Sequence, residues 1–155
     1  MTVTHARRVV VVASTWHDEA AGGLIRGAEG ALGRAGVDYS LVRVSSTFHL
    51  PVVVKTAARS GADAVVALGV IVRGNSPRFE FFSEAVTSGL MAVAVETGTP
   101  VGFGVLIVDD EAQAHDRAGF ADSRESKGWE SAESALDALR ACDELRAASG
   151  GSDVV

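Results

Sequence analysis

The segment RGNSPRFEFF, residues 73–82, joins an apolar run to a helical pattern and holds residue types suited to binding an anion. Gly74 and Asn75 lead to Ser76 and Pro77, and a proline fits the first position of a helix. The unpaired amides and the positive dipole end of that helix would favour a ligand such as phosphate. Ser76 could instead serve only as the helix cap, because the turn matches neither a Walker loop nor a dinucleotide fingerprint. Both interpretations can hold together.

Three arginines could strengthen such an anion site. Arg73 and Arg78 flank the turn, and Arg117 follows a short helical stretch. Guanidinium groups can bind phosphate through two parallel hydrogen bonds. Arginines are also common on solvated surfaces, so without other observations the solvent-exposed interpretation is favoured.

Aromatic and imidazole side chains follow the first two apolar runs. Trp16 lies where the first run ends, and its ring can stack on a planar heterocycle or simply pack in the core. Phe48 has the same two options after the second run. His49, with an ordinary pKa of ~6.5, suits general base catalysis, and the alternative is a local hydrogen bond at the start of a helix.

Four apolar runs must position these groups, at residues 9–13, 39–44, 64–72 and 101–108. Continuous rather than alternating apolar runs are typical of strands buried on both faces. Helical patterns follow each of them, at residues 25–32, 50–59, 79–93 and 129–142. This order predicts an α/β protein, a three-layer α/β/α sandwich on a four-stranded parallel sheet. Ligands bind at the carboxyl ends of the strands in such sheets, where the candidate residues lie.

The bulk composition limits domain number and partners. A chain of 155 residues is the usual size of one domain, so we expect a single domain over 1–155 with flexible tails at 1–7 and 147–155. The net charge of -6 disfavours nucleic acid and anionic membranes and favours small-molecule partners. The apolar runs are too short to span a bilayer and residues 1–8 lack an apolar signal core, which predicts a cytoplasmic protein. The histidines are scattered without ligand spacing, so we expect no metal site.

Longer stretches of the chain resemble the lumazine synthase family. Residues 63–106 look like the family's strand, phosphate turn, long helix and next strand without a gap. Residues 110–119 and 127–136 look like its next segment, and the resemblance runs from about Val9 to Leu145. It implies a flavodoxin-like fold and an enzyme that needs no cofactor.

The implied reaction joins 5-amino-6-ribitylaminouracil to 3,4-dihydroxy-2-butanone 4-phosphate and yields 6,7-dimethyl-8-ribityllumazine and phosphate in riboflavin biosynthesis. The amine attacks the ketone to form an imine, phosphate leaves, and the resulting enol tautomerises and closes the ring. Such an enzyme mostly positions two substrates and stabilises phosphate. The family builds pentameric rings with active sites between neighbouring subunits, so the resemblance implies at least a pentamer and leaves decamers and icosahedral shells open.

The resemblance also implies roles for individual residues. The positions that match the family's substrate-binding residues are Trp16 for pyrimidine stacking, Thr47, Phe48 and His49 for the ribityl chain, Val70, Ile71 and Val72 for the pyrimidine edge, Asn75 and Ser76 for the phosphate turn, Phe103 for a contact from the neighbouring subunit, Arg117 for phosphate, and Lys127 for the family's lysine.

Two positions depart from the family pattern. The family reads roughly Pro-Gly-Ala-Phe-Glu-x-Pro where this chain has SSTFHLP at 45–51, so His49 replaces the ribityl-binding carboxylate. The family's acid–base histidine is here Arg78, which stays protonated and cannot accept a proton. Arg78 can still strengthen the anion site or stabilise departing phosphate. Arg78 and His49 are therefore the candidate catalytic residues.

Three interpretations are compatible with these departures. In the first, condensation persists at a lower rate with His49 supplying an imidazole, because general acid–base help contributes only about 10²–10⁴-fold. In the second, the chain is a specialised paralog that joins the butanone phosphate, or a similar sugar phosphate, to a different amine. In the third, it is a non-catalytic protein that binds lumazine or flavin or forms a shell. The retained pocket residues favour the two enzymatic interpretations.

Overall fold

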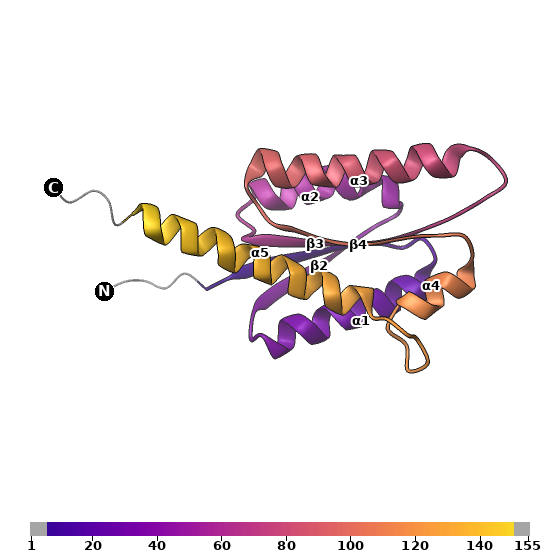
Figure 1. The fold of residues 1–155 in the computed structure, drawn as a ribbon, viewed down its shortest axis with the longest axis horizontal. Helices are drawn as coiled ribbons and strands as arrows, with labels where there is room; N and C mark the ends of the chain where they lie inside the picture. Colours follow the sequence, from indigo (N-terminus) through magenta and orange to yellow (C-terminus); the bar gives the residue numbers. More distant parts are fainter. Residues whose placement is uncertain (1–5, 151–155) are drawn as a thin grey trace.

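The computed structural model describes residues 6–150 and shows a parallel four-stranded sheet between two layers of helices (Figure 1). The strands are β1 (Arg8–Ser14), β2 (Asp38–Val44), β3 (Ala64–Val72) and β4 (Val101–Val108), in the order β2-β1-β3-β4. All pairings are parallel, so the carboxyl ends of the strands meet at one edge of the sheet. The four predicted strands are confirmed, although β1 and β2 begin one residue earlier than the apolar pattern indicates.

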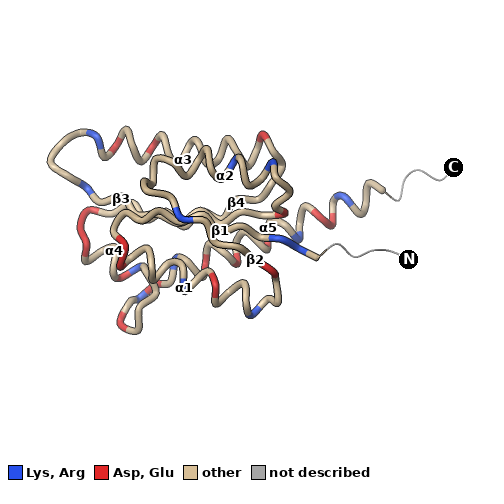
Figure 2. The backbone as a smooth tube through the Cα atoms, turned by 180° about the vertical axis from the view of Figure 1, so that it is seen from behind, with Lys and Arg blue, Asp and Glu red and all other residues tan. Residues whose placement is uncertain are grey.

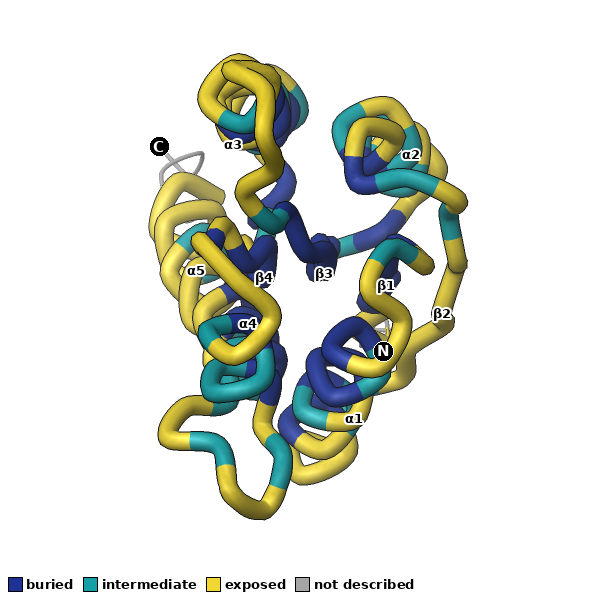
Figure 3. Tube along the Cα trace, turned by 90° about the vertical axis from the view of Figure 1, so that its right-hand side faces the viewer, coloured by how far each residue is buried: buried dark blue, intermediate teal, exposed yellow. Residues whose placement is uncertain are grey.

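Helices cover both faces of the sheet. One layer holds α2 (Leu50–Arg59) and α3 (Arg78–Thr97), and the other holds α1 (Asp18–Arg34), α4 (Glu111–Arg117) and α5 (Lys127–Ser149) (Figures 1 and 3). A short 3-10 turn, η1 (Thr47–His49), precedes α2. The three-layer α/β/α sandwich of flavodoxin-like type is thereby confirmed.

The continuous apolar runs are explained by two separate cores, one on each face of the sheet. In β3, Val66 and Leu68 face the α1 and α5 layer, while the alternate residues Val65 and Ala67 face the α2 and α3 layer. Both faces of β3 are covered, so every residue of the strand before Val72 is buried. The central strands are therefore fixed in place, and their carboxyl ends form a firm base for a site.

Strand β2 is an exception to the expectation that all four apolar runs are buried on both faces. Its side chains are exposed from Asp38 to Arg43, with Tyr39 37%, Leu41 40% and Val42 40% exposed. The reason is position, since β2 is an edge strand and the helices pack over the centre of the sheet (Figure 3). Apolar side chains that are exposed at a sheet edge indicate a surface that needs a cover.

The predicted tails are shorter than expected at both ends of the chain. Helix α5 continues to Ser149, so residues 147–149 are helical rather than part of a tail. Arg7, expected in the amino-terminal tail, forms an ion pair with Asp143 of α5. The remaining tail residues 1–5 and 151–155 lie outside the described residues.

Two properties of the described part of the chain bear on its partners. Across residues 6–150, no helix is both long enough and apolar enough to cross a bilayer. In the same part of the chain, no three His, Cys, Asp or Glu side chains gather so that they could hold a metal ion.

Candidate active site

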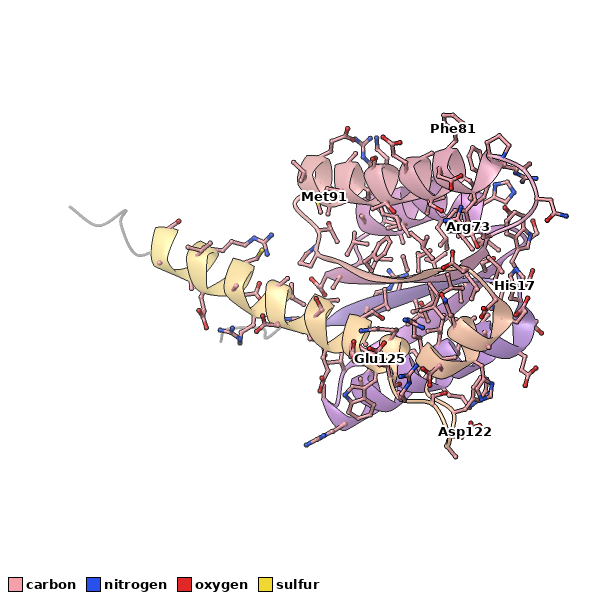
Figure 4. All side chains as sticks on the ribbon, turned by 45° about the vertical axis from the view of Figure 1, so that its right-hand side comes forward. His17, Arg73, Phe81, Met91, Asp122 and Glu125 are labelled. Carbon is pink, nitrogen blue, oxygen red and sulfur yellow. The ribbon has the colours of Figure 1, made fainter. Side chains whose placement is uncertain are left out.

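A cavity of about 230 Å³ opens at the carboxyl edge of the sheet, where β1 and β3 end and α3 begins. The amino-terminal turns of α3 cover it from one layer and the start of α1 borders it from the other (Figure 4). Its lining residues are Trp16, His17, Ile71, Val72, Gly74, Ser76, Arg78, Phe79 and Phe82. The position agrees with the general location of ligand sites in parallel sheets.

One wall of the cavity is aromatic, and Phe82 is its centre. The Trp16 ring stacks on Phe82, with centroids 5.5 Å apart and planes inclined by 18°. Phe48 contacts Phe82 from η1 at 5.2 Å, and the Arg78 guanidinium lies 5.4 Å from the Phe82 centroid. Phe82 was not among the predicted site residues, although its spacing of four from Arg78 places both on one helix face. The four side chains form a cluster of stacked and tilted aromatic rings with one cation, and aromatic groups of this kind suit contact with a planar heterocycle.

The turn before α3 differs by one residue from the predicted arrangement. Helix α3 begins at Arg78, so Pro77 occupies the cap position rather than the first helical position. The Ser76 hydroxyl accepts a hydrogen bond from the Arg78 backbone N–H at 3.4 Å, and Asn75 and Ser76 are both exposed. Ser76 therefore lies one residue before the cap position, which Pro77 holds, and it also lines the cavity.

Arg73 braces this turn. Its Nε donates to Asp109 Oδ1 at 2.9 Å, its Nη1 donates to Glu80, and its guanidinium lies 4.3 Å over the Phe79 ring. These contacts raise the pKa of Arg73, and they hold the pKa of Asp109 and of Glu80 below the usual range. Arg73, at the end of β3, is thus paired with Asp109 after β4 and with Glu80 in the first turn of α3 (Figure 4). Because Arg73 is already paired with two carboxylates, Arg78 is the arginine beside this turn that lines the cavity.

The brace predicts a pH-dependent contribution to stability. The pKa of Glu80 is lowered, chiefly by its hydrogen bond with Arg73, so its contribution is present above the unfolded pKa and is lost as pH falls through the folded pKa. We expect Glu80→Gln to lower the Tm near neutral pH, and this effect to fade only as the pH falls from the usual glutamate pKa of about 4.3 through the lower pKa that Glu80 has in the folded protein. Thermal unfolding across this pH range measures the difference.

The matched control is Glu84→Gln, one turn further along α3. Glu84 is exposed and forms no ion pair within residues 6–150. We expect the Tm of the Glu84→Gln variant to equal that of the unaltered protein at every pH. Equal effects of the two substitutions would show that the Arg73 brace contributes nothing measurable.

The residues predicted to hold the ribityl chain lie beside and beneath the cavity. Thr47 is fully buried, and its hydroxyl donates to the Val70 carbonyl at 3.1 Å, so both residues support the strand end from below. Phe48 is 57% exposed and reaches the cavity wall through Phe82. His49 is exposed at the start of α2, outside the set of residues that line the cavity. Ile71 and Val72 do line it.

The remaining predicted residues gather at a different cavity. This second cavity, of about 320 Å³, follows the edge strand β4 from Phe103 to Val108 and is completed by Arg117 and Lys127. Arg117 donates to the Gln113 carbonyl at 3.0 Å, and the Lys127 ammonium lies 2.7 Å from Glu130 and 3.4 Å from Glu125. The hydrogen bond with Glu130 is the main reason that the pKa of Lys127 is raised.

The two cavities divide the predicted site between two parts of the chain. Trp16, Ser76 and Arg78 belong to the first cavity, whereas Phe103 and Arg117 belong to the second. A single described chain does not bring the two groups into one pocket. Within the chain, the two cavities are therefore separate.

His17 is a cavity residue that the sequence interpretation missed. Its Nδ1 lies 2.5 Å from the Glu111 carboxylate of α4, and its backbone is left-handed at φ 51 and ψ 59. Its place immediately after Trp16 in STWHDE was the available signal. Only the fold shows that it pairs with a carboxylate so far along the chain.

Known proteins are similar to this chain over most of the described residues. The family model described as 6,7-dimethyl-8-ribityllumazine synthase matches residues 6–143. A protein of that name from Leifsonia xyli subsp. xyli is 57% identical over 139 residues, covering 90% of this chain and 88% of the relative. Proteins of the same name from Clavibacter sepedonicus and Streptomyces coelicolor are 56% identical over 128 residues and 52% identical over 130 residues. Each of these two covers 83% of this chain, and the matches span 80% and 81% of the relatives.

Proposed function

Because the chain belongs to the 6,7-dimethyl-8-ribityllumazine synthase family, we propose that it condenses 5-amino-6-ribitylaminouracil with 3,4-dihydroxy-2-butanone 4-phosphate in riboflavin biosynthesis. The single observation that carries this proposal is the family match across residues 6–143, which includes both cavities. The protein is then a transferase that works without a cofactor, and we place it in the cytoplasm.

The first cavity has the features needed to align the two substrates. The Trp16 ring, backed by Phe82, offers a stacking surface for the pyrimidine. The turn at Asn75 and Ser76, beside the Arg78 guanidinium, suits the phosphate of the second substrate. Holding the amine and the ketone in reacting geometry removes most of the entropic barrier to imine formation. The residues of the cavity thus support positioning as the main catalytic device.

Assembly into rings is part of the same proposal. The second cavity would supply Phe103, Arg117 and Lys127 to the first cavity of a neighbouring subunit, completing the phosphate subsite. Large apolar side chains lie uncovered on the outer face of α3, where Phe81 is 73% and Met91 64% exposed (Figure 4). The middle of α3 carries no charged residue from 85 to 95 (Figure 2). We propose a pentamer or a multiple of pentamers, in which a neighbouring copy covers these surfaces.

A second candidate function rests on the two residues that depart from the family pattern. His49 stands at the family's carboxylate position, and Arg78 lines the cavity at the family's histidine position. This favours, as the alternative, a paralog that keeps the sugar-phosphate half of the site and joins it to a different amine. A non-catalytic lumazine-binding protein is the third candidate.

One assay separates the three candidates. The purified protein is given both substrates, and lumazine formation and phosphate release are followed separately against a reaction without protein. Lumazine well above the uncatalysed rate is the result that we expect. Phosphate release without lumazine would support the paralog, whereas lumazine binding with neither product would support the binding protein and overturn the enzymatic proposal.

A further inference from the structure

The proposed reaction needs a group that accepts a proton, and few cavity residues can do so. Elimination of phosphate requires removal of a proton from the carbon next to the imine. Arg78 lines the cavity but stays protonated, and His49 lies outside the lining. Among the described residues that line the cavity, His17 is the only one whose side chain ordinarily titrates near neutral pH.

On the basis of the proposed function, we propose that His17, oriented by Glu111, is the catalytic base of this reaction. His17 follows the stacking residue Trp16 directly, so its imidazole borders the place where the pyrimidine amine would lie. Figure 4 places it at the carboxyl edge of the sheet, between the α3 layer and the layer of α1 and α4. Neither the family's histidine position nor the predicted site included this residue.

The backbone conformation at His17 directs its side chain. With φ at 51 and ψ at 59, it is the only residue other than glycine with a positive φ in the described part of the chain. This left-handed conformation is unfavourable for most residues with a β-carbon, and asparagine, aspartate and histidine adopt it most readily. Residues in such conformations concentrate at functional sites. Because of this conformation, the His17 side chain leaves the backbone in a different direction from the Trp16 side chain.

Glu111 fixes which imidazole nitrogen is free. Its Oε1 lies 2.5 Å from His17 Nδ1, so Nδ1–H donates to the carboxylate and Nε2 is left as the proton acceptor. Glu111 begins α4, whose first turn is held by the Asp110 side chain accepting from the Gln113 N–H at 2.8 Å. A carboxylate on Nδ1 also stabilises the imidazolium that forms when Nε2 takes up a proton.

Several charged groups surround His17. Asp18 and Glu19 begin α1, and Asp18 is paired with Arg43 of β2 at 2.8 Å. Arg78 shares the first cavity with His17. A neighbouring cavity of about 410 Å³ places His17 with Asp18, Glu19, Glu111 and His115.

His17 Nε2 takes the proton from the carbon between the imine and the phosphate-bearing carbon, and the C–H electrons form a carbon–carbon double bond as the C–O bond to phosphate breaks. The imidazolium then returns its proton to the terminal carbon of the enol. The enol hydroxyl releases its proton to the departing phosphate, which leaves a methyl ketone and neutral imidazole. Ring closure on that ketone follows.

The test uses the full-length protein and His17→Asn, because asparagine accepts the left-handed conformation. We expect kcat for lumazine formation to fall about 10²–10⁴-fold with KM nearly unchanged, and the acidic limb of the pH profile to disappear. Added imidazole should restore part of the activity of His17→Gly. The matched control is His115→Asn on α4, outside the first cavity, which should retain the rate and pH profile of the unaltered protein.

Two results would overturn the assignment of His17. One is a His17→Asn rate within about twofold of the unaltered protein, far less than loss of a general base causes. The other is a loss of activity in His17→Gly that imidazole does not repair. A readout independent of turnover is the ¹⁵N spectrum of the imidazole, in which added 6,7-dimethyl-8-ribityllumazine should shift Nε2 of His17 while Nδ1 stays protonated. Absence of lumazine from the unaltered protein contradicts the proposed function, whereas an unshifted Nε2 contradicts the role of His17.

Discussion

Co-expression of a Trp16→Ala chain with an Arg117→Met chain is expected to give more lumazine formation than either variant alone. The two residues line different cavities of one chain, and in the proposed ring a complete site takes one cavity from each of two neighbours. Loss of aromatic stacking costs about 1–3 kcal/mol, which is roughly 5–150-fold in affinity. Loss of a charged hydrogen bond to phosphate costs about 1.5–3 kcal/mol. Each variant alone is therefore expected to lose activity by about one to two orders of magnitude.

Mixing restores activity because random assembly regenerates complete sites. If every site joins two subunits, about one quarter of the interfaces in an equal mixture carry both native half-sites. The measurement is lumazine formation per subunit after co-expression, compared with the separately purified variants. The control is a chain that carries both substitutions, mixed with either single variant. Every chain in such a mixture lacks the same residue, so no complete site can form. Activity in the first mixture no higher than in the single variants would mean that one chain forms its own site.

Gly128→Ala is expected to lower the free energy of unfolding by about 1–3 kcal/mol, the usual cost of overpacking. Gly128 lies in the first turn of α5 against α1, and a β-carbon there would come within 2.0 Å of the Leu24 carbonyl oxygen. A backbone oxygen cannot move aside as a flexible side chain can, so α5 must shift relative to α1. Each kcal/mol corresponds to a Tm change of roughly 2–4 °C for a chain of this size. Thermal unfolding measures the loss.

Gly33→Ala in α1 is the matched control for Gly128→Ala. Gly33 is exposed and a β-carbon there would meet nothing within 4 Å. Alanine at an unstrained helical position is expected to be neutral or to stabilise by up to about 1 kcal/mol. Because Lys127 precedes Gly128 at the second cavity, Gly128→Ala should also reduce lumazine formation. An unchanged Tm for Gly128→Ala would show that the two helices adjust without cost.

Local sequence patterns were sufficient for the four strands and for the start of α3, whereas α1 begins at Asp18, before the helical pattern expected at residues 25–32. The apolar run at residues 64–72 coincides with β3, because covering both faces of a strand requires an uninterrupted run of apolar residues. Pro77 with Ser76 marked the start of the long helix to within one residue, since capping depends on neighbours in the chain. That position 78 carries an arginine, which stays protonated, was equally visible, because it needs only residue type.

The sequence by itself determined the order of strands and helices, the turn before α3 and the absence of a base at Arg78. The tertiary structure decided which residues meet: it occupied Arg73 with Asp109, placed Phe103 and Arg117 at a separate cavity, and left β2 exposed at the edge of the sheet. It also joined His17 to Glu111. The physical reason is that periodicity and capping act between near neighbours, whereas these contacts depend on strand order and on the packing of helices far apart in the chain.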